Sequence, residues 1–471
     1  MLNPVTDELE ADLRGVLPAA AFRPLSAAYL EEPRGRYAGQ DGLLIAPAST
    51  DEVSAVMKAA YEACVPVVPY GGGTGLVGGQ VAPVGPKPII LSLERMNKIL
   101  DVYPTENVLI AQAGAILADV QAAADLHDRL FALSLASEGS ARIGGNLATN
   151  AGGVNVLRYG NTRDQCLGLE VVLPNGDIWN GLSRLRKDNT GYDLRNLMIG
   201  SEGSLGIITA AALKLHPKPT GQGTAFFVVP TPHAALDLLA LARSQMAEGV
   251  SAFELIGQQG LEFLSETMPD VRQPFETAPE WMVLIDVGLP TGLDPATALE
   301  HLFEMAVEQG ICTDGTIAQN EGQRQEFWAV RENIPEANRR VGSISSHDIS
   351  LPISSIPDFI RRGLQAISAV GDFRINCFGH VGDGNLHYNV YPQIGKSRQD
   401  HLQEREQIKR AVHDLVHQMQ GSVSAEHGIG RLKVEDLQRY SDPTKLALIE
   451  TIKSAIDPKG IMNPGVIVPQ S

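Results

Sequence analysis

The sequence predicts an α+β protein of more than one domain, and three observations lead to that expectation. The chain has 471 residues, which corresponds to about two to four domains of roughly 100–200 residues each. Residues 40–217 are dense in glycine clusters and short apolar runs, whereas residues 224–375 alternate strand-like and helix-like runs. Between them, HPKPTGQG can neither continue a strand nor start a helix. We therefore expect an N-terminal segment and three further parts, at 1–39, 40–217, 218–425 and 426–471.

Composition and charge narrow the class of protein. Hydrophobic residues make up 44% of the chain and charged residues 20%, close to the averages of folded proteins, which excludes a disordered chain. The 38 basic and 55 acidic residues give a net charge of −17. This balance argues against nucleic acid or an anionic membrane surface as a partner, because both select basic surfaces. An acidic substrate would need local positive charge.

The N-terminus and the cysteines bear on the cell compartment. The first basic side chain, Arg14, follows four acidic ones, so the chain lacks the basic start of a signal peptide and the Arg-rich face of a transit peptide. No stretch reaches about 18 apolar residues, so we expect no spanning helix. The widely spaced cysteines favour neither a disulfide scaffold nor a thiolate zinc site: Cys64, Cys166, Cys312 and Cys377. We expect a cytoplasmic protein with free thiols.

A helix is predicted to begin after Ser49. Ser49 and Glu52 form an S-x-x-E capping box, and the apolar residues that follow share one helical face: Val53, Val56, Met57 and Ala60. The strand-like run VPVVPY at 65–70 comes next and leads into a glycine cluster.

Three glycine clusters lie in the first domain, at 71–80, 143–153 and 200–208. The first contains a G-x-G-x-x-G match, but the prolines that follow prevent the helix that a Rossmann fingerprint requires: Pro83, Pro86 and Pro88. A single cluster is most simply a set of tight turns. Three of them predict a dinucleotide held by loops, because consecutive glycines let several N–H groups converge on an anion.

The second domain reads as a sheet with helices on one face. Strand-like runs (TAFFVVP, WMVLIDV, DISLPI) alternate with helical runs (HAALDLLALARSQMAEG, ALEHLFEMAVEQG, IPDFIRRGLQAISAV).

The segment CFGHVGDGNLHYNV at 377–390 predicts a β-hairpin, because an Asp-Gly pair at its centre favours a two-residue turn. Counting outward from that turn puts His380 opposite His387. Opposed residues have Cβ atoms about 4.5–5.5 Å apart, so the imidazoles would project from one face with Asn389 beside them. Two imidazoles placed in this way could bind a divalent metal. The alternative is a stacked, hydrogen-bonded His pair on a surface hairpin.

A third ligand is available in SAEHGIGR at 424–431, which offers Glu426 and His427 beside a glycine turn. Two His and one carboxylate with open positions make a zinc-like catalytic site, and the same ligands can hold Mn or Fe. No H-E-x-x-H occurs, which argues against a metalloprotease.

Long motifs make the chain similar to a known family: PYGGGTGLVGGQV, IGGNLATNAGGVNVLRYG, LGLEVVLPNGDIW, DNTGYDLRNLMIGSEGSLGIIT and IDPKGIMNPG. Over residues 30–471 it resembles the FAD-linked D-2-hydroxyacid dehydrogenases of the vanillyl-alcohol-oxidase-type flavoprotein superfamily. Within that group it looks most like the D-2-hydroxyglutarate dehydrogenases, with D-lactate dehydrogenases and the glycolate oxidase flavin subunit as neighbours. The resemblance implies an FAD-binding domain of two small α+β subdomains, an α+β substrate domain with an antiparallel sheet, and a C-terminal helical segment that returns to the flavin.

The same resemblance implies the cofactor contacts. They fall on Gly71, Gly72, Thr74, Gly75, Gly79, Gly145, Asn146, Thr149, Gly152, Gly153, Glu202, Gly203, Gly206, Ile207 and Asn463. Relatives that bind flavin covalently usually have a His where this chain has Thr74. Because Thr cannot form that bond, we expect non-covalent FAD.

The resemblance also assigns the metal, and the residue next to one of its expected ligands is our candidate for the base. It puts Glu426 on a divalent metal with His380 and His387, with zinc as first choice. His427 is the expected catalytic base, since the unperturbed pKa of a His, about 6.5, lies near working pH. The alternative for His427 is a supporting contact to a metal ligand.

Arg331 in EFWAVREN matches the family's substrate-binding arginine, and we expect it to be catalytic as well; alone, it would read as a helix-surface charge. Two positions depart from the hydroxyglutarate-specific pattern, with Ser346 in place of a Lys and Pro335 in place of a Thr. The distal carboxylate would then be held by His347 or Arg339, or be absent from the substrate. The expected substrate-binding residues are Arg331, Asn389, Ser346 and His347.

The implied function is oxidation of D-2-hydroxyglutarate, or a related acid such as D-malate, to the 2-oxo acid, with hydride transfer to flavin N5. Alternatives are a D-lactate dehydrogenase, a non-catalytic flavin-binding subunit and a flavin-free metal-dependent hydrolase. Because the chain has no Fe–S cysteine set, the electrons are expected to leave to an external acceptor, such as electron-transfer flavoprotein or a quinone. A homodimer is one open possibility for the assembly.

Overall fold

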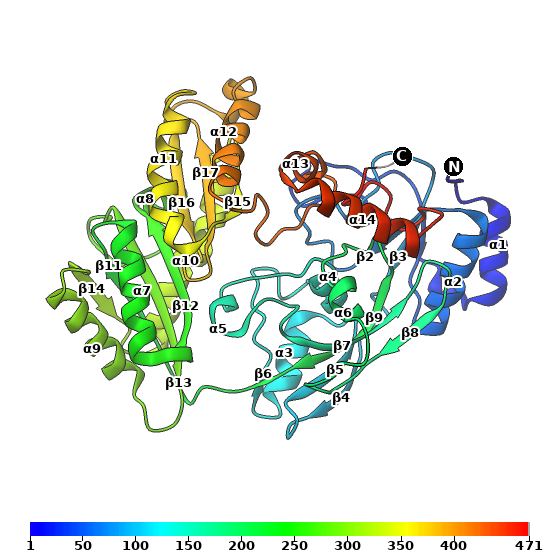
Figure 1. Ribbon diagram of the computed structural model, residues 1–471, viewed down its shortest axis with the longest axis horizontal. Helices are drawn as coiled ribbons and strands as arrows, with labels where there is room; N and C mark the ends of the chain where they lie inside the picture. The colour runs from blue at the N-terminus through cyan, green and yellow to red at the C-terminus, as the bar shows by residue number, and fades with distance from the viewer. Residues whose placement is uncertain (470–471) are drawn as a thin grey trace. The chain divides into compact units, whose positions relative to one another are not determined.

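The computed structural model describes residues 1–469, which form two compact units (Figure 1). Unit 1 comprises Met1–Gly152, Gly160–Lys218 and the residues from Glu426 onward, and unit 2 comprises Gly153–Tyr159 and Pro219–Ala425. Neither unit is a continuous stretch of chain. All four cysteines are free, as expected. Among the described residues, no helix combines the length and apolar character that crossing a membrane requires.

Unit 1 contains two main sheets with helices around them. A parallel sheet has the order β1 (Leu43–Ile45), β3 (Ile89–Ser92), β2 (Val67–Tyr70). An antiparallel sheet has the order β4 (Ile99–Tyr103), β5 (Val108–Gln112), β9 (Ile207–Lys214), β7 (Cys166–Val172), β8 (Ile178–Gly181), and β6 (Arg129–Leu130) pairs with β10 (His216–Pro217). The helices are α1 (Asp7–Val16), α2 (Thr50–Ala63), α3 (Leu117–Asp125), α4 (Ile143–Ala148), α6 (Leu194–Met198), α13 (Val434–Tyr440) and α14 (Pro443–Ile456).

Helix α2 has the N-terminal cap and the apolar face that its sequence predicts. The Ser49 hydroxyl accepts a hydrogen bond from the Glu52 N–H at 3.2 Å, while the Glu52 carboxylate accepts from the Ala48 N–H at 2.8 Å rather than from Ser49. The predicted apolar face is buried: Val53, Val56, Met57 and Ala60. After β2 the chain runs through the first glycine cluster to β3 without a helix, which confirms that this is not a Rossmann turn.

The second glycine cluster differs from the expected loop, because its first six residues form helix α4. Ile143 and Leu147, one turn apart, are both fully buried, so packing on the core outweighs the poor helix propensity of the two glycines. A Cβ on Gly144 would lie 2.8 Å from the Ala113 Cβ, so the glycine allows the helix to approach the sheet.

Unit 2 is built on a seven-stranded antiparallel sheet. Its order is β14 (Asp314–Ile317), β11 (Gly221–Val228), β13 (Trp281–Leu289), β12 (Val250–Gly257), β16 (Arg374–Gly379), β17 (Asn385–Tyr391), β15 (Asp348–Ser350). The helices are α5 (Val156–Tyr159), α7 (Pro232–Met246), α8 (Gln258–Thr267), α9 (Pro295–Glu308), α10 (Glu321–Val341), α11 (Ile356–Ser368) and α12 (Arg405–Gln418).

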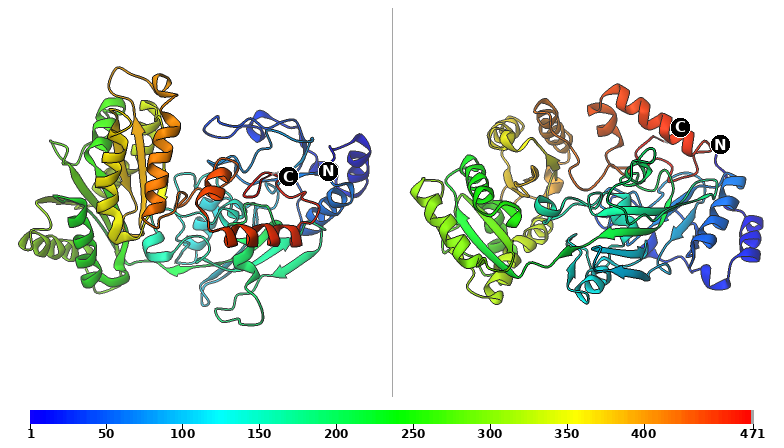
Figure 2. Two further views of the ribbon diagram at one scale, coloured as in Figure 1. Left: turned by 45° about the horizontal axis from the view of Figure 1, so that its top comes forward. Right: turned by 60° about the horizontal axis from the view of Figure 1, so that its bottom comes forward.

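Helices cover both faces of this sheet, so the expected one-sided arrangement is wrong. Phe226 contacts Phe327 of α10, whereas the next residue, Phe227, contacts Phe303 of α9, and successive strand residues point to opposite faces. Helices α8 and α10 pack on one face; Figures 1 and 2 show α7, α11 and α12 side by side on the other. Helix α10 is largely polar in composition, so its sequence does not indicate the face that packs on the sheet.

The β16–β17 hairpin has a register different from the predicted one. His387 pairs with Phe378, not with His380, and the connection spans residues 380–384 instead of an Asp-Gly turn. A Cβ on Gly384 would lie 2.4 Å from the Leu351 carbonyl oxygen, so contact with the segment after β15 shapes this loop. The shift is two residues, which preserves the face on which side chains lie. The His380 and His387 rings therefore stay close, with centroids 5.7 Å apart.

In unit 1 a buried carboxylate holds the start of the C-terminal segment. The oxygens of Glu202 accept hydrogen bonds from the Ile429 and Gly430 N–H groups, each at 2.7 Å. Burial raises the pKa of Glu202 to about 7, although these two hydrogen bonds favour the ionised form.

Replacing Gly379 by Ala should distort the hairpin that carries the histidines. Gly379 has φ of +148°, and a Cβ there would lie 2.8 Å from the Asn385 carbonyl oxygen. We expect a loss of about 3 kcal/mol of unfolding free energy. Gly395→Ala is the control, since Gly395 has φ of +84° with no described atom within 4 Å, and it should cost about 1 kcal/mol. Equal losses in urea unfolding would contradict the steric explanation.

Glu202→Gln should change how stability depends on pH. Because the pKa of Glu202 is raised from 4.5 to about 7 in the folded state, the folded protein binds more protons than the unfolded chain across that window. The contribution of Glu202 therefore falls as pH rises through the window, by about 3 kcal/mol. Urea unfolding at pH 5 and pH 8 should show the variant gaining stability relative to wild type at the higher pH. A difference independent of pH would refute the assignment.

Candidate functional site

Unit 1 brings the three glycine clusters and the C-terminal segment together. A Cβ on Gly71 would lie 3.4 Å from the Gly145 Cα, so the first two clusters approach to van der Waals contact. The Glu202 N–H donates to the Ala148 carbonyl at 2.8 Å, which joins the third cluster to the second. The Asn463 side chain donates to the carbonyls of Gly79 and Glu202, each at 2.9 Å.

The groups at this junction fit a large polar ligand such as FAD. The buried carboxamide oxygens of Asn146 and Asn463 have no hydrogen-bond partner among the described residues. Polar groups left in this way normally find a partner, so a ligand that donates hydrogen bonds there is chemically reasonable. A Cβ on Gly72, by contrast, would lie 2.2 Å from the Ser140 carbonyl oxygen, so protein packing alone requires that glycine.

The remaining predicted cofactor residues lie in the three glycine clusters, and two of them mark a boundary between the units. Thr149 ends α4, and its hydroxyl donates to the Gly145 carbonyl at 2.9 Å. Gly152 closes the first segment of unit 1, while Gly153 belongs to unit 2. The other predicted positions lie in the first cluster, before β9 or at its first residue: Thr74, Gly75, Gly203, Gly206 and Ile207.

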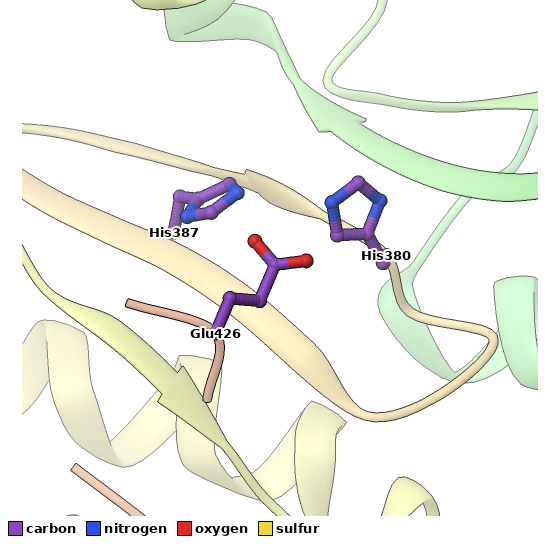
Figure 3. Close-up of side chains that lie close together, drawn as sticks. All are labelled: His380, His387 and Glu426. Carbon is purple, nitrogen blue, oxygen red and sulfur yellow. The ribbon is translucent and has the colours of Figure 1, made fainter. Parts of the chain in front are cut away.

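His380, His387 and Glu426 form a candidate metal site (Figure 3). One ligand atom from each lies within 4.8 Å of the others. Zn–N distances of about 2.0–2.1 Å in a tetrahedron require ligand atoms roughly 3.3 Å apart, so small side-chain movements suffice. Imidazole and carboxylate are borderline ligands suited to zinc and to related divalent ions. The donor set fits a divalent metal.

The position of Glu426 is set by the backbone contacts of the segment just before it. It directly follows Ala425, whose N–H donates to the Asp348 carbonyl at 3.3 Å, and Ser422 pairs with Ser350 of β15. Asp348 in turn lies opposite His387 in the sheet. Asp348, Glu426 and His427 make a second group whose ligand atoms lie within 4.8 Å of one another, which brings the predicted base His427 next to the predicted metal ligands.

Glu254 links one histidine of the site to the predicted substrate arginine. One carboxylate oxygen lies 2.5 Å from Nδ1 of His380, and the other accepts from Nε of Arg331 at 2.7 Å. Burial alone would raise the pKa of Glu254, but the charges of His380 and Arg331 hold it down at about 2.

Other predicted substrate residues are divided between the faces of the sheet. Asn389 is two residues beyond His387 and on the same face, and its side-chain oxygen accepts from the His347 N–H at 3.0 Å. The His347 ring lies 5.1 Å from that of His413 in α12, on the opposite face. Ser346 is exposed, with its hydroxyl 2.6 Å from that of Ser343.

Two members of this arrangement were missed in the sequence, Glu254 and Asp348. A signal for Glu254 was present, because it is a single carboxylate in the otherwise uncharged run VSAFELIG, and that strand is buried throughout. Asp348 lies in the predicted strand DISLPI beside the candidate residue His347, but its place opposite His387 depends on pairing between distant segments.

Comparison with known proteins identifies the family of this chain. Residues 42–181 match the family model "FAD binding domain", and residues 218–467 match "FAD linked oxidases, C-terminal domain". The chain is 36% identical over 439 residues to the mitochondrial D-2-hydroxyglutarate dehydrogenase of Arabidopsis thaliana, covering 93% of this chain and 76% of that protein. It is 38% identical over 421 residues to the D-2-hydroxyglutarate dehydrogenase of Xanthomonas citri pv. viticola, covering 89% and 87%.

A solved structure shares the fold. That of p-cresol methylhydroxylase with substrate bound superimposes with a TM-score of 0.75 at 15% identity, covering 100% of this chain and 99% of that one. Together with the two family matches, it confirms the predicted architecture of an FAD-binding domain followed by an α+β domain with an antiparallel sheet. The chain is an FAD-dependent dehydrogenase and belongs to the FAD-linked D-2-hydroxyacid dehydrogenases of the vanillyl-alcohol-oxidase-type superfamily.

Proposed function

We propose that this enzyme oxidises D-2-hydroxyglutarate to 2-oxoglutarate with FAD and a divalent metal, zinc being the first choice. The observation that carries the proposal is the grouping of His380, His387 and Glu426, with Glu254 joining His380 to Arg331. The metal site and the Arg331 guanidinium are both held by the buried Glu254. Together they suit a substrate with a hydroxyl next to a carboxylate. Relatives of this chain are named for that substrate.

Each residue has a chemical task in this proposal. Bound FAD supplies a hydride acceptor, and a bound divalent cation acidifies a hydroxyl. His380, His387 and Glu426 would hold the cation, which leaves open positions for substrate oxygens. His427 would accept the hydroxyl proton on a ring nitrogen. Arg331 would bind a carboxylate through its two terminal nitrogens, in the bidentate geometry that a guanidinium favours.

A D-lactate dehydrogenase is the second candidate, because the groups considered for a distal carboxylate are engaged elsewhere. Arg339 donates two hydrogen bonds to Glu336, each at 2.7 Å, and its side chain is mostly exposed. The His347 ring packs beside His413, on the face away from His387. Asn389 and Ser346 are the remaining predicted substrate-binding residues, and of these only Ser346 stands at a position expected near the distal end.

Two further parts of the proposal concern the acceptor and the cell compartment. We propose electron-transfer flavoprotein or a quinone as the acceptor that reoxidises the flavin. The Arabidopsis relative is named as mitochondrial, and a cytoplasmic location stays a prediction for this chain.

The substrate is tested with an anaerobic panel of D-2-hydroxyglutarate, D-malate, D-lactate and glycolate. We expect the flavin to bleach fastest with D-2-hydroxyglutarate and kcat/KM to be highest for it. If D-lactate exceeded both dicarboxylates by tenfold or more, about 1.4 kcal/mol in transition-state binding, the second candidate would replace the first.

Replacing His380 by Ala should remove the bound metal and abolish turnover while FAD stays bound, since the glycine clusters, apart from Gly153, belong to unit 1. Metal content by mass spectrometry, flavin absorbance and kcat measure the three effects. His233→Ala is the control, because His233 is exposed at the start of α7. Full activity of wild type after complete removal of divalent ions would refute the metal's part in the proposal.

A further inference from the structure

We propose that Glu254 is a positioning residue that fixes His380 and Arg331 relative to one another; the inference rests on the proposed function, which gives these two residues their roles. Glu254 lies in β12, where every residue is buried, and its side chain is 0% exposed. A carboxylate removed from water is unfavourable unless charged or hydrogen-bonded partners replace the solvent. Glu254 therefore depends on both of its partners, and they come from two other elements.

The contact with His380 selects which imidazole nitrogen can bind a metal. An ionised carboxylate only accepts hydrogen bonds, so Nδ1 of His380 carries the proton that it shares with Glu254 at 2.5 Å. Metal binding requires Nε2 to be deprotonated, and the ring is then neutral with its lone pair on Nε2. A carboxylate behind a ligating histidine fixes the tautomer and ring orientation and makes the ligand more basic.

The contact with Arg331 leaves the end of the guanidinium available. Glu254 accepts from Nε, and within residues 1–469 the two terminal nitrogens of Arg331 have no protein acceptor. The guanidinium also lies over the Phe378 ring, 4.9 Å from its centroid. Arg331 is thus held by Glu254 and by an aromatic face, with its fork left to bind an external carboxylate.

Phe378 also belongs to the histidine side of the arrangement. It pairs with His387 across β16 and β17, and the two ring centroids are 4.9 Å apart. Glu254 contacts one of the two histidines through a hydrogen bond, and Phe378 packs beside the other. Because Glu254 contacts both His380 and Arg331, loss of its charge should weaken metal binding and substrate binding together.

The sheet offers a matched control in Asp286. This buried carboxylate lies in β13 on the same face of the sheet and pairs with Arg324 of α10, at 3.2 Å, two helical turns before Arg331. It also accepts from Trp328 Nε1 at 3.2 Å and is hydrogen-bonded to Thr224. Asp286→Asn removes a buried charge from the same interface between helix and sheet without touching His380.

The experiment compares Glu254→Gln with Asp286→Asn in the full-length flavoprotein. Protein freed of divalent ions is titrated with ZnCl₂ by calorimetry, and KM and kcat for D-2-hydroxyglutarate are measured after reloading with zinc. We expect Glu254→Gln to weaken zinc binding about 10–100-fold and to raise KM, with flavin absorbance unchanged. Asp286→Asn should leave zinc affinity within twofold of wild type. Glu254→Asp, which keeps the charge, should recover part of both losses.

The outcomes separate this inference from the proposed function. Zinc affinity and KM of Glu254→Gln within twofold of wild type would overturn the role of Glu254 alone, as would an equal loss of zinc affinity in Asp286→Asn. Wild-type protein that binds no ZnCl₂ would overturn the proposed function together with this inference. If Glu254→Gln does not fold, Glu254→Asp decides through the same readings, because a shortened carboxylate that changes neither value contradicts a positioning role.

Discussion

The alternation of side chains along β17 is the constraint on which the candidate site depends. His387, Asn389 and Tyr391 lie on the face covered by α8 and α10, whereas Tyr388 lies on the other face, against Phe359 of α11. A change of register by one residue would exchange these two sets. The cross-strand neighbours of His387, which are Phe378 and Asp348, share its face for the same reason. One pairing pattern thus sorts the polar side chains from those that only pack.

Much of this could be read from the sequence because the determining interactions are local. The capping of α2 by Ser49, the absence of a helix after the first glycine cluster and the fold class all follow from short stretches of chain. The grouping of His380 with His387 was anticipated even though the register was not, since an even shift keeps both rings on one face. Here local turn preference competed with the close approach of Gly384 to Leu351, and the tertiary contact prevailed.

The features that escaped prediction are long-range. Glu254 is 77 residues from Arg331 and 126 from His380 in sequence, so no spacing rule connects them. The sequence did show Glu254 as a single charged residue within a strand of core residues. Asp286 in WMVLIDVGL is a second such case. Both carboxylates meet an arginine from α10, a helix whose polar composition hid its buried stripe of Val330, Ile334 and Ala337. A lone acid in an apolar strand thus indicates a partner elsewhere in the fold.

One feature of unit 1 determines when its amino-terminal sheet can be completed during synthesis. Residue Val67 of β2 donates its N–H to the Ile461 carbonyl and accepts from the Asn463 N–H, each at 2.9 Å or less. A nascent chain that has released β1, β2 and β3 from the ribosome still lacks the segment that covers the outer edge of β2. That edge stays open to other strands until almost the whole polypeptide has emerged, so completion of the amino-terminal sheet is a late event in biogenesis, and truncation before Ile461 would leave it exposed.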